Sequence, residues 1–128
     1  MAIYGIGVDL LRVERGERLW QRFGERATRK LLHPAEAALL AHRRPGALIA
    51  RSFAVKEAFV KALGTGFAEL GIEFREIGAG HAADGRPALV LSAALEVRVR
   101  DMGVGDRHLS ISDEGGVVIA FVVLERRE

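Results

Sequence analysis

The sequence of 128 residues contains no cysteine, which excludes a disulfide framework, a thiolate nucleophile and a cysteine-ligated metal site. Aromatic residues make up only 6% of it, and 3 prolines interrupt it. No apolar run approaches the ~20 residues that a membrane-spanning helix needs. Residues 1–5 lack the basic and apolar regions of a secretory signal peptide. We therefore expect a cytoplasmic protein that makes no membrane contact.

The composition is that of a globular domain, with 49% hydrophobic residues and a mean hydropathy of +0.13. The absence of repeats, low-complexity segments and linkers predicts one domain over residues 1–128. The net charge of +2 is mild, and acids are interspersed among the bases. Together with the few aromatics, this distribution disfavours nucleic-acid binding.

Residues 53–66 form the segment around which the chain is organised. The first ten are apolar on almost every side, which predicts a buried helix, yet they include Lys56, Glu57 and Lys61. Buried charges need a partner or a ligand because stripping their water is costly. Only 3 of the 19 basic residues are lysines, and two lie here, which indicates that a compact ammonium group matters. An ordinary Glu57–Lys61 ion pair is the alternative interpretation. The Gly-Thr-Gly at 64–66 ends the helix and frees backbone N–H groups for a ligand.

The N-terminal part of the chain predicts a strand followed by a basic helix. Residues 3–10 are typical of a strand, with Asp9 at or near its end, either as the N-cap of the next helix or as part of a site. The helix over residues 11–23 is amphipathic, with arginines on its flank. This arginine flank is either a solvated surface or a docking face for an acidic partner. Its arginines are Arg12, Arg15, Arg18 and Arg22.

The remaining pattern predicts an α+β fold, a single domain with a mostly antiparallel sheet packed on helices. Further helices are expected over residues 25–32, 34–42, from 47 into the central segment, and 92–102. Further strands are expected over residues 71–77, 88–91, 107–113 and 117–124, with a turn region at 78–87. The strand at 117–124 is apolar on both faces, which predicts burial in the core or in a subunit interface.

The candidate chemistry rests on two carboxylates, Asp9 and Glu57, with no histidine or cysteine cluster to accompany them. Mg²⁺ typically takes one or two carboxylates and completes its shell with water and substrate phosphate. Lysine and backbone amides near a glycine-rich turn suit phosphate groups. The residues therefore predict metal-assisted chemistry on a phosphorylated or nucleotide-like substrate.

Five short blocks carry a resemblance to a known family. They are GIGVDL at 5–10, FAVKEA at 53–58, KALGTG at 61–66, GRP at 85–87 and HLSIS at 108–112. In this order and at this chain length they resemble the holo-[acyl-carrier-protein] synthases, the short, trimeric type of phosphopantetheinyl transferase. The resemblance runs from residue 3 to about residue 124.

The resemblance implies an activity and an assembly. The enzyme would transfer the phosphopantetheine group of coenzyme A to a serine of apo acyl carrier protein. The products would be holo acyl carrier protein and adenosine 3',5'-bisphosphate, as a step of fatty acid biosynthesis. A homotrimer with its sites between subunits would do this with Mg²⁺. The nucleophile would belong to the partner, which is why the chain needs no activated serine or cysteine of its own.

The resemblance also implies roles for individual residues. Asp9 and Glu57 would bind Mg²⁺, Glu57 would help to deprotonate the serine, and Lys61 would hold pyrophosphate oxygens, so these three are the expected catalytic residues. The coenzyme would be bound by Arg51, Lys61, Gly64, Thr65, Gly66, Pro87 and His108. The acidic carrier protein would dock on the first helix, at Arg12, Arg15, Arg18 and Arg22.

Two positions depart from the family pattern. Asp113 stands where the family often has histidine, so we give it no catalytic role. The loop over residues 66–71 is short and holds Glu69, which predicts a local difference in the nucleotide pocket. The competing hypothesis is a non-catalytic module that holds an acidic helical protein on the arginine flank. Changing Glu57→Gln separates the two, because only a transferase would lose turnover.

Overall fold

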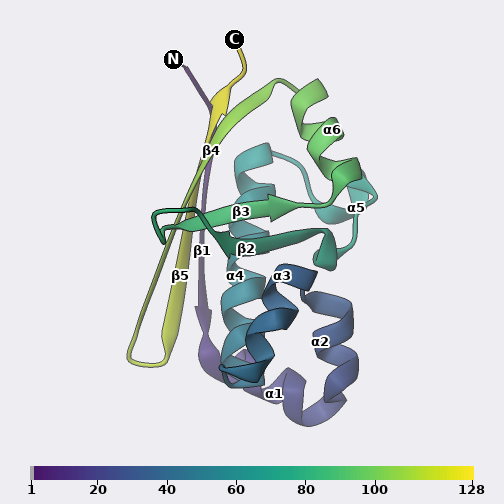
Figure 1. The fold of residues 1–128 in the computed structure, drawn as a ribbon, viewed down its shortest axis with the longest axis vertical. Helices are drawn as coiled ribbons and strands as arrows, with labels where there is room; N and C mark the ends of the chain where they lie inside the picture. The colour runs from purple at the N-terminus through teal and green to yellow at the C-terminus, as the bar shows by residue number, and fades with distance from the viewer. Residues whose placement is uncertain (1) are drawn as a thin grey trace.

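The structure, a computed structural model, describes residues 2–128 (Figure 1). The strands are β1 (Ile3–Arg12), β2 (Ile77–His81), β3 (Pro87–Leu91), β4 (Val104–Glu114) and β5 (Val117–Arg126). The α-helices are α1 (Val13–Phe23), α2 (Glu25–Leu31), α3 (Pro34–Ala37), α4 (Pro45–Leu63), α5 (Phe67–Leu70) and α6 (Ala93–Asp101). Two 3₁₀ turns, η1 (Ala38–Ala41) and η2 (Phe74–Glu76), complete the order. Helices α1, α2 and α3 gather at one end of the molecule, and α6 lies at the other (Figure 1).

Strands β1, β5 and β4 form an antiparallel sheet with β5 in the middle, and β2 and β3 form a separate antiparallel pair. Residues of β5 alternate between the two faces of the sheet. Those that face α4 are buried: Val118, Ala120, Val122 and Leu124. On the opposite side, which we call the outer face, Ile119 and Phe121 are exposed. The single chain therefore covers one face of this sheet and leaves the other to solvent.

Helix α4 is the core of the domain, and both of its ends are set by the sequence. Pro45 occupies the first turn, where a missing N–H costs nothing. Gly64 ends the helix with a left-handed φ of 82°. Between them the helix is apolar nearly all round, and most of its side chains are buried.

Two glycines of β1 allow the strand to lie directly on α4. A Cβ added at Gly5 would stand 1.8 Å from the carbonyl oxygen of Ala62, and one at Gly7 would stand 1.9 Å from that of Ala58. Any side chain at either position would push the strand away from the helix. The Gly-Ile-Gly of the sequence is thus a packing requirement, and it brings Asp9, two residues after Gly7 on the same strand face, toward α4.

Helix α1 crosses α4 just as closely. A Cβ at Gly16 would stand 2.1 Å from the carbonyl oxygen of Gly46. The apolar side of α1 is held against α4 by this contact, while its arginines remain on the outside. The predicted amphipathic helix is confirmed, and the chain enters it directly from the end of β1.

The α+β fold class is confirmed, and two local predictions, for residues 71–77 and 78–87, are wrong in part. Residues 71–77 alternate apolar and charged, but Phe74–Glu76 form a 3₁₀ turn closed by reciprocal capping between Glu73 and Glu76. Phe74 stacks with Phe53 and Phe67, at ring-centroid distances of 5.5 and 4.3 Å. The alternation therefore packs a half-buried aromatic side chain against two others and does not pair a strand.

The strand predicted over residues 71–77 begins only at Ile77. There β2 starts, and it occupies the first half of the predicted turn region at 78–87. Its glycines and alanine make the segment resemble a turn. A Cβ at Gly78 would stand 2.5 Å from the His33 Cβ, so this small residue serves close packing under the turn before α3.

Within residues 2–128 no helix is both long and apolar enough to cross a bilayer.

Candidate active site

Asp9, Glu57 and Lys61 come together where β1 runs along α4. The Lys61 Nζ donates hydrogen bonds to the Val8 carbonyl oxygen, at 3.0 Å, and to Asp9 Oδ1, at 3.1 Å. Lys61 therefore pairs with Asp9 and not with Glu57, its neighbour one turn earlier on the helix. Asp9 is not a helix cap, because β1 continues to Arg12, which occupies the N-cap position of α1.

Glu57 lies close enough to Asp9 for the Asp9 carboxylate to change its pKa. Burial raises the pKa of Glu57 most, and the Asp9 carboxylate raises it further. The cations Lys61 and Arg15 act in the opposite direction but do not cancel the rise. Two carboxylates thus share a partly desolvated corner, where they repel each other when both are ionised.

This donor set fits a hard divalent cation. Carboxylate oxygens are the ligands that Mg²⁺ prefers, and a cation between Asp9 and Glu57 would remove their mutual repulsion. No group of three or more histidine, cysteine, aspartate or glutamate side chains gathers as a metal cluster in the described part of the chain. Two protein ligands suit Mg²⁺, which keeps its other positions for water and phosphate.

The Gly-Thr-Gly segment follows the last turn of α4, one turn beyond Lys61. Gly64 is the helix C-cap, and Gly66 is the N-cap position of the short helix α5. The Thr65 hydroxyl donates to Glu69 Oε2 at 3.0 Å. Glu69, which the sequence marked as unusual in this loop, therefore orders the segment by holding Thr65.

Arg51 lies in a separate basic pocket at the other end of α4. The pocket has a volume of about 300 Å³, and its charged lining residues are Arg43, Arg44, Arg51 and Asp113. Burial lowers the pKa of Arg51 most, the charge of Arg43 lowers it further, and Asp113 opposes both. The sequence analysis missed Arg43 and Arg44 as site residues, although their position just before the helix-starting Pro45 was a usable signal.

His108 and Pro87 lie apart from the carboxylates. His108 is on β4 with its side chain on the outer face, where Nε2 lies 2.6 Å from Glu125 Oε2. Asp9 is on the opposite, α4-facing side of the same sheet. Pro87 begins β3, in the two-stranded sheet. Within one chain, the structure therefore does not bring these two residues together with Asp9 and Glu57.

The four arginines predicted on the first helix are exposed along one end of the molecule, although Arg12 ends β1 and only the other three lie in α1. Arg18 forms an ion pair with Glu14, and the Arg22 guanidinium lies 5.1 Å from the centre of the Phe23 ring. Arg15 differs from the others because it reaches toward α4, with its guanidinium 5.9 Å from the centre of the Phe53 ring. Its effect on the pKa of Glu57 shows that Arg15 lies between the rest of α1 and the carboxylates.

Lys56, the second lysine of the central helix, points away from this site. It is fully buried and pairs with Glu36 of α3 at 2.8 Å. Burial lowers the pKa of Lys56, and Glu36 opposes the change. The expectation that a buried charge must be paired is met here, but by a residue that the sequence analysis did not single out.

Comparison with known proteins places these observations in a family. Residues 5–121 match the model of the 4'-phosphopantetheinyl transferase superfamily. The chain is 46% identical to the holo-[acyl-carrier-protein] synthase of Alkalilimnicola ehrlichii over 125 residues, which cover 96% of this chain and 97% of that one.

Solved structures agree with the sequence comparison. The holo-[acyl-carrier-protein] synthase of Neisseria meningitidis superposes with a TM-score of 0.86 at 40% identity and covers 97% of this chain and 99% of its own. The enzyme of Helicobacter pylori, solved in complex with coenzyme A, superposes with a TM-score of 0.78 at 29% identity and covers 94% and 99%. The chain therefore belongs to the holo-[acyl-carrier-protein] synthase family of phosphopantetheinyl transferase enzymes.

Proposed function

We propose that this enzyme transfers the phosphopantetheine group of coenzyme A to a serine hydroxyl of apo acyl carrier protein in a Mg²⁺-dependent reaction. The products would be holo acyl carrier protein and adenosine 3',5'-bisphosphate. The observation that carries the proposal is the convergence of Asp9, Glu57 and Lys61 where β1 meets α4. In the cytoplasm, the reaction would supply holo acyl carrier protein for fatty acid biosynthesis.

The chemistry follows from what each side chain is able to do. Asp9 and Glu57 would hold Mg²⁺, which would neutralise charge on the pyrophosphate and on the leaving phosphate. Glu57 is the group that would accept the serine proton, directly or through a bound water. Of the three N–H donors of Lys61, two meet Val8 and Asp9, which leaves one for a pyrophosphate oxygen.

Coenzyme A would extend from this corner along the enzyme. The backbone of Gly64 and Gly66, next to Lys61, is open to the approach of a ligand. The pocket around Arg51 offers three guanidinium groups, which suit a phosphate group through charge-assisted hydrogen bonds. We infer that a phosphate group of the coenzyme binds in this pocket because of these guanidinium groups; the related H. pylori enzyme was solved in complex with coenzyme A.

The acyl carrier protein would dock on α1. Between α1 and α2 lies an apolar groove of about 460 Å³, lined by Leu19, Phe23, Arg26, Ala27, Lys30 and Leu31. Apolar side chains framed by cations match an acidic amphipathic helix. Arg15 lies on α1 and close to Glu57, so it would stand beside the point where the incoming serine approaches Glu57.

A homotrimer would complete the site. Most of the exposed large apolar side chains of residues 2–128 lie on the outer face of the three-stranded sheet: Ile3, Ile6, Val8, Leu10, Ile119 and Phe121. An apolar patch of this extent is typical of a subunit interface. His108 lies on the same face, so a neighbouring copy packed there is the means by which His108 would contribute to a site between subunits.

The test is the intact mass of an apo acyl carrier protein after incubation with this enzyme, coenzyme A and Mg²⁺. We expect a gain of one phosphopantetheine group, which a chelator and a carrier serine-to-alanine variant both abolish. Asp9→Asn and Glu57→Gln should abolish it too, whereas Glu114→Gln, an exposed carboxylate at the hairpin end, should not. No gain with several carrier proteins would contradict the proposal and favour a binding module.

A further inference from the structure

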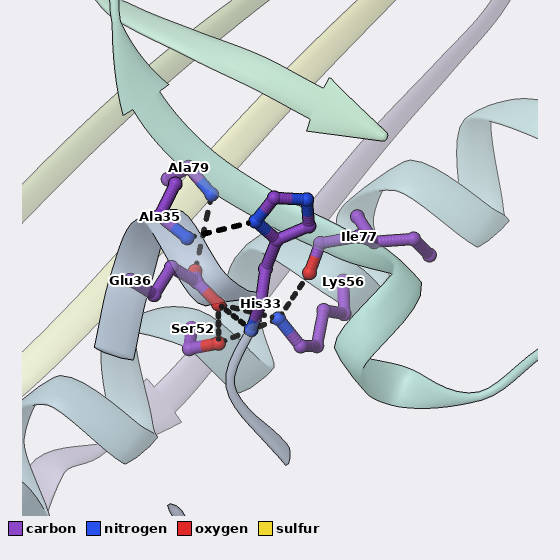
Figure 2. A network of polar contacts seen from close by, with 7 residues as sticks. All are labelled: His33, Ala35, Glu36, Ser52, Lys56, Ile77 and Ala79. Carbon is purple, nitrogen blue, oxygen red and sulfur yellow. Dashed lines mark hydrogen bonds and ion pairs between the residues drawn. The ribbon is translucent and has the colours of Figure 1, made fainter. Parts of the chain in front are cut away.

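A buried polar cluster lies on the flank of α4 that the proposed reaction does not use (Figure 2). It consists of Glu36 from α3, Ser52 and Lys56 from α4, and backbone groups of His33 and β2. The Lys56 side chain is 0% exposed and that of Glu36 is 2% exposed. None of the hydrogen bonds described for this cluster includes Asp9.

The charged groups of this cluster are fully satisfied. The Lys56 Nζ donates to Glu36 Oε1 at 2.8 Å, to Ser52 Oγ at 2.7 Å, and to the Ile77 carbonyl oxygen. All three of its N–H groups therefore have an acceptor. Glu36 Oε1 also accepts from the Ser52 hydroxyl at 2.7 Å and from the His33 backbone N–H at 3.0 Å. Glu36 Oε2 accepts from the Ala79 backbone N–H at 3.1 Å.

Stability alone does not account for such a cluster. Removing two charges from water costs nearly as much as their attraction returns, so a well-packed apolar pair is often equally stable or more stable. What an ion pair adds over an apolar pair is direction, because each hydrogen bond requires one particular geometry. Here the bonds join three elements, α3, α4 and β2, at fixed relative positions.

On the opposite flank of α4, the directional contacts to β1 are those of Lys61, whose side chain is half-exposed and donates to Val8 and Asp9. There β1 rests on the helix through Gly5 and Gly7, which face the backbone of Ala62 and Ala58. This close backbone contact sets the distance between strand and helix, but Gly5 and Gly7 carry no side chains that interlock with α4. Because Glu57 and Asp9 lie on different elements, their separation depends on how α4 is rotated about its own axis.

We propose that the Glu36–Lys56 ion pair is a positioning device that fixes the rotation of α4 and so holds Glu57 at the distance from Asp9 that a divalent cation requires. Glu36, Ser52 and Lys56 are buried and out of reach of coenzyme and carrier protein, so they act through Glu57. The inference rests on the proposed function in one respect, namely that Asp9 and Glu57 are the cation ligands.

The experiment replaces the pair by apolar residues of similar shape, Glu36→Leu with Lys56→Met, so that no unpaired charge remains buried. We expect a folded enzyme whose kcat falls by about tenfold or more, while its KM for the carrier protein stays within about twofold. Mn²⁺ binding in the presence of coenzyme A, measured by electron paramagnetic resonance, should weaken by about tenfold. A folded double variant with wild-type kcat and wild-type Mn²⁺ affinity would overturn the proposal.

A second variant keeps the proposal testable if the double variant does not fold. Gly78→Ala keeps every hydrogen-bonding group of the cluster, but its Cβ would stand 2.5 Å from the His33 Cβ and 3.3 Å from the Glu36 Cδ. His33 must then shift, which displaces the backbone N–H that it donates to Glu36, and we expect Mn²⁺ binding to weaken several-fold. Unchanged Mn²⁺ affinity and unchanged kcat in this variant would count against a positioning role.

Leu95→Ala is the matched control for lost stability. Leu95 is fully buried on α6 and takes no part in the cluster, so this variant should lower the thermal midpoint and leave kcat and Mn²⁺ affinity unchanged. If the wild-type enzyme binds Mn²⁺ but transfers nothing, the proposed function fails, while the Mn²⁺ measurements still test the positioning role. If the wild type transfers and the cluster variants match it, the positioning inference alone fails.

Discussion

At the scale of single residues, Glu57 destabilises the metal-free fold when it is ionised, yet the proposed reaction needs its carboxylate. Burial and the nearby Asp9 both disfavour its ionised form and so raise its pKa. A group with a raised folded-state pKa supports folding fully below its unfolded value, and that support is lost as pH rises through the folded value. At neutral pH the metal-free enzyme therefore carries an ionised Glu57 at some cost to its stability.

Changing Glu57→Gln should raise the thermal midpoint of the metal-free enzyme at pH 7.5 by a few degrees. The expected gain in the free energy of unfolding is below about 1 kcal/mol, because Glu57 is only half-buried and water screens its charge. The gain should shrink toward pH 4, where wild-type Glu57 is protonated. Thermal unfolding with a chelator at both pH values measures this, and an unchanged or lower midpoint at pH 7.5 would contradict it.

Changing Lys61→Ala should weaken the use of coenzyme A more than docking of the carrier protein. The variant loses the ammonium beside Asp9, and a charge-assisted hydrogen bond of about 1.5–3 kcal/mol corresponds to roughly ten- to hundredfold in the KM for coenzyme A. Separate kinetic titrations of the two substrates measure the difference. A rise confined to the KM for carrier protein would show that Lys61 acts elsewhere.

At the scale of elements, helix α1 would serve two tasks, carrier docking and the support of Glu57. Arg15 lies close enough to Glu57 to oppose the rise in its pKa, whereas Arg22 lies on the exposed side beside Phe23. A charge reversal at Arg15 would raise the KM for carrier protein, as docking predicts, but it would also place a third carboxylate beside Glu57. Arg22 is therefore the cleaner position at which to test docking.

Changing Arg22→Glu should raise the KM for carrier protein by about tenfold at low salt, leave the KM for coenzyme A unchanged, and reduce the salt dependence of the reaction. Arg100→Glu is the matched control, since Arg100 is an exposed arginine on α6, away from α1. Equal KM values for carrier protein in the Arg22 variant and the wild type would remove α1 from the docking site.

At the scale of the whole molecule, a single chain leaves the apolar outer face of the sheet uncovered. Its apolar side chains include Ile6 at 54% exposed, Leu10 at 65% and Phe121 at 42%. His108 lies on this face, while Asp9 lies on the other side of the same sheet. If both serve one site, as we propose, the site requires more than one copy of the chain.

Changing Phe121→Asp should convert the proposed trimer to monomers and lower kcat by at least about tenfold, because a charge at the centre of an apolar interface is strongly unfavourable. Analytical ultracentrifugation and activity measure the two effects. Val97→Asp, at a side chain 48% exposed on α6, is the matched control and should change neither. A Phe121 variant that stays trimeric, or that becomes a fully active monomer, would contradict the proposal.

The sequence by itself determined the fold class, the central helix and the residues of the Asp9–Glu57–Lys61 corner. Their signals are local: apolar periodicity, a glycine at the helix end, and charged residues where apolar ones are expected. Local signals also explain the error at residues 71–77, since an alternating pattern packs Phe74 against its aromatic neighbours equally well from a 3₁₀ turn.

Only the tertiary structure decided which charges meet. Lys61 pairs with Asp9, 52 residues away in sequence, and Lys56 pairs with Glu36, although Glu57 is adjacent to one lysine and one turn from the other. Helical spacing indicates which side chains share a face, but which face meets which neighbour is set by packing. Here Gly5 and Gly7 bring β1 onto one flank of α4, and Gly78 brings β2 close to α3 beside the other flank. A charge then pairs with whatever donor or acceptor that packing delivers, because no buried charge is stable without one.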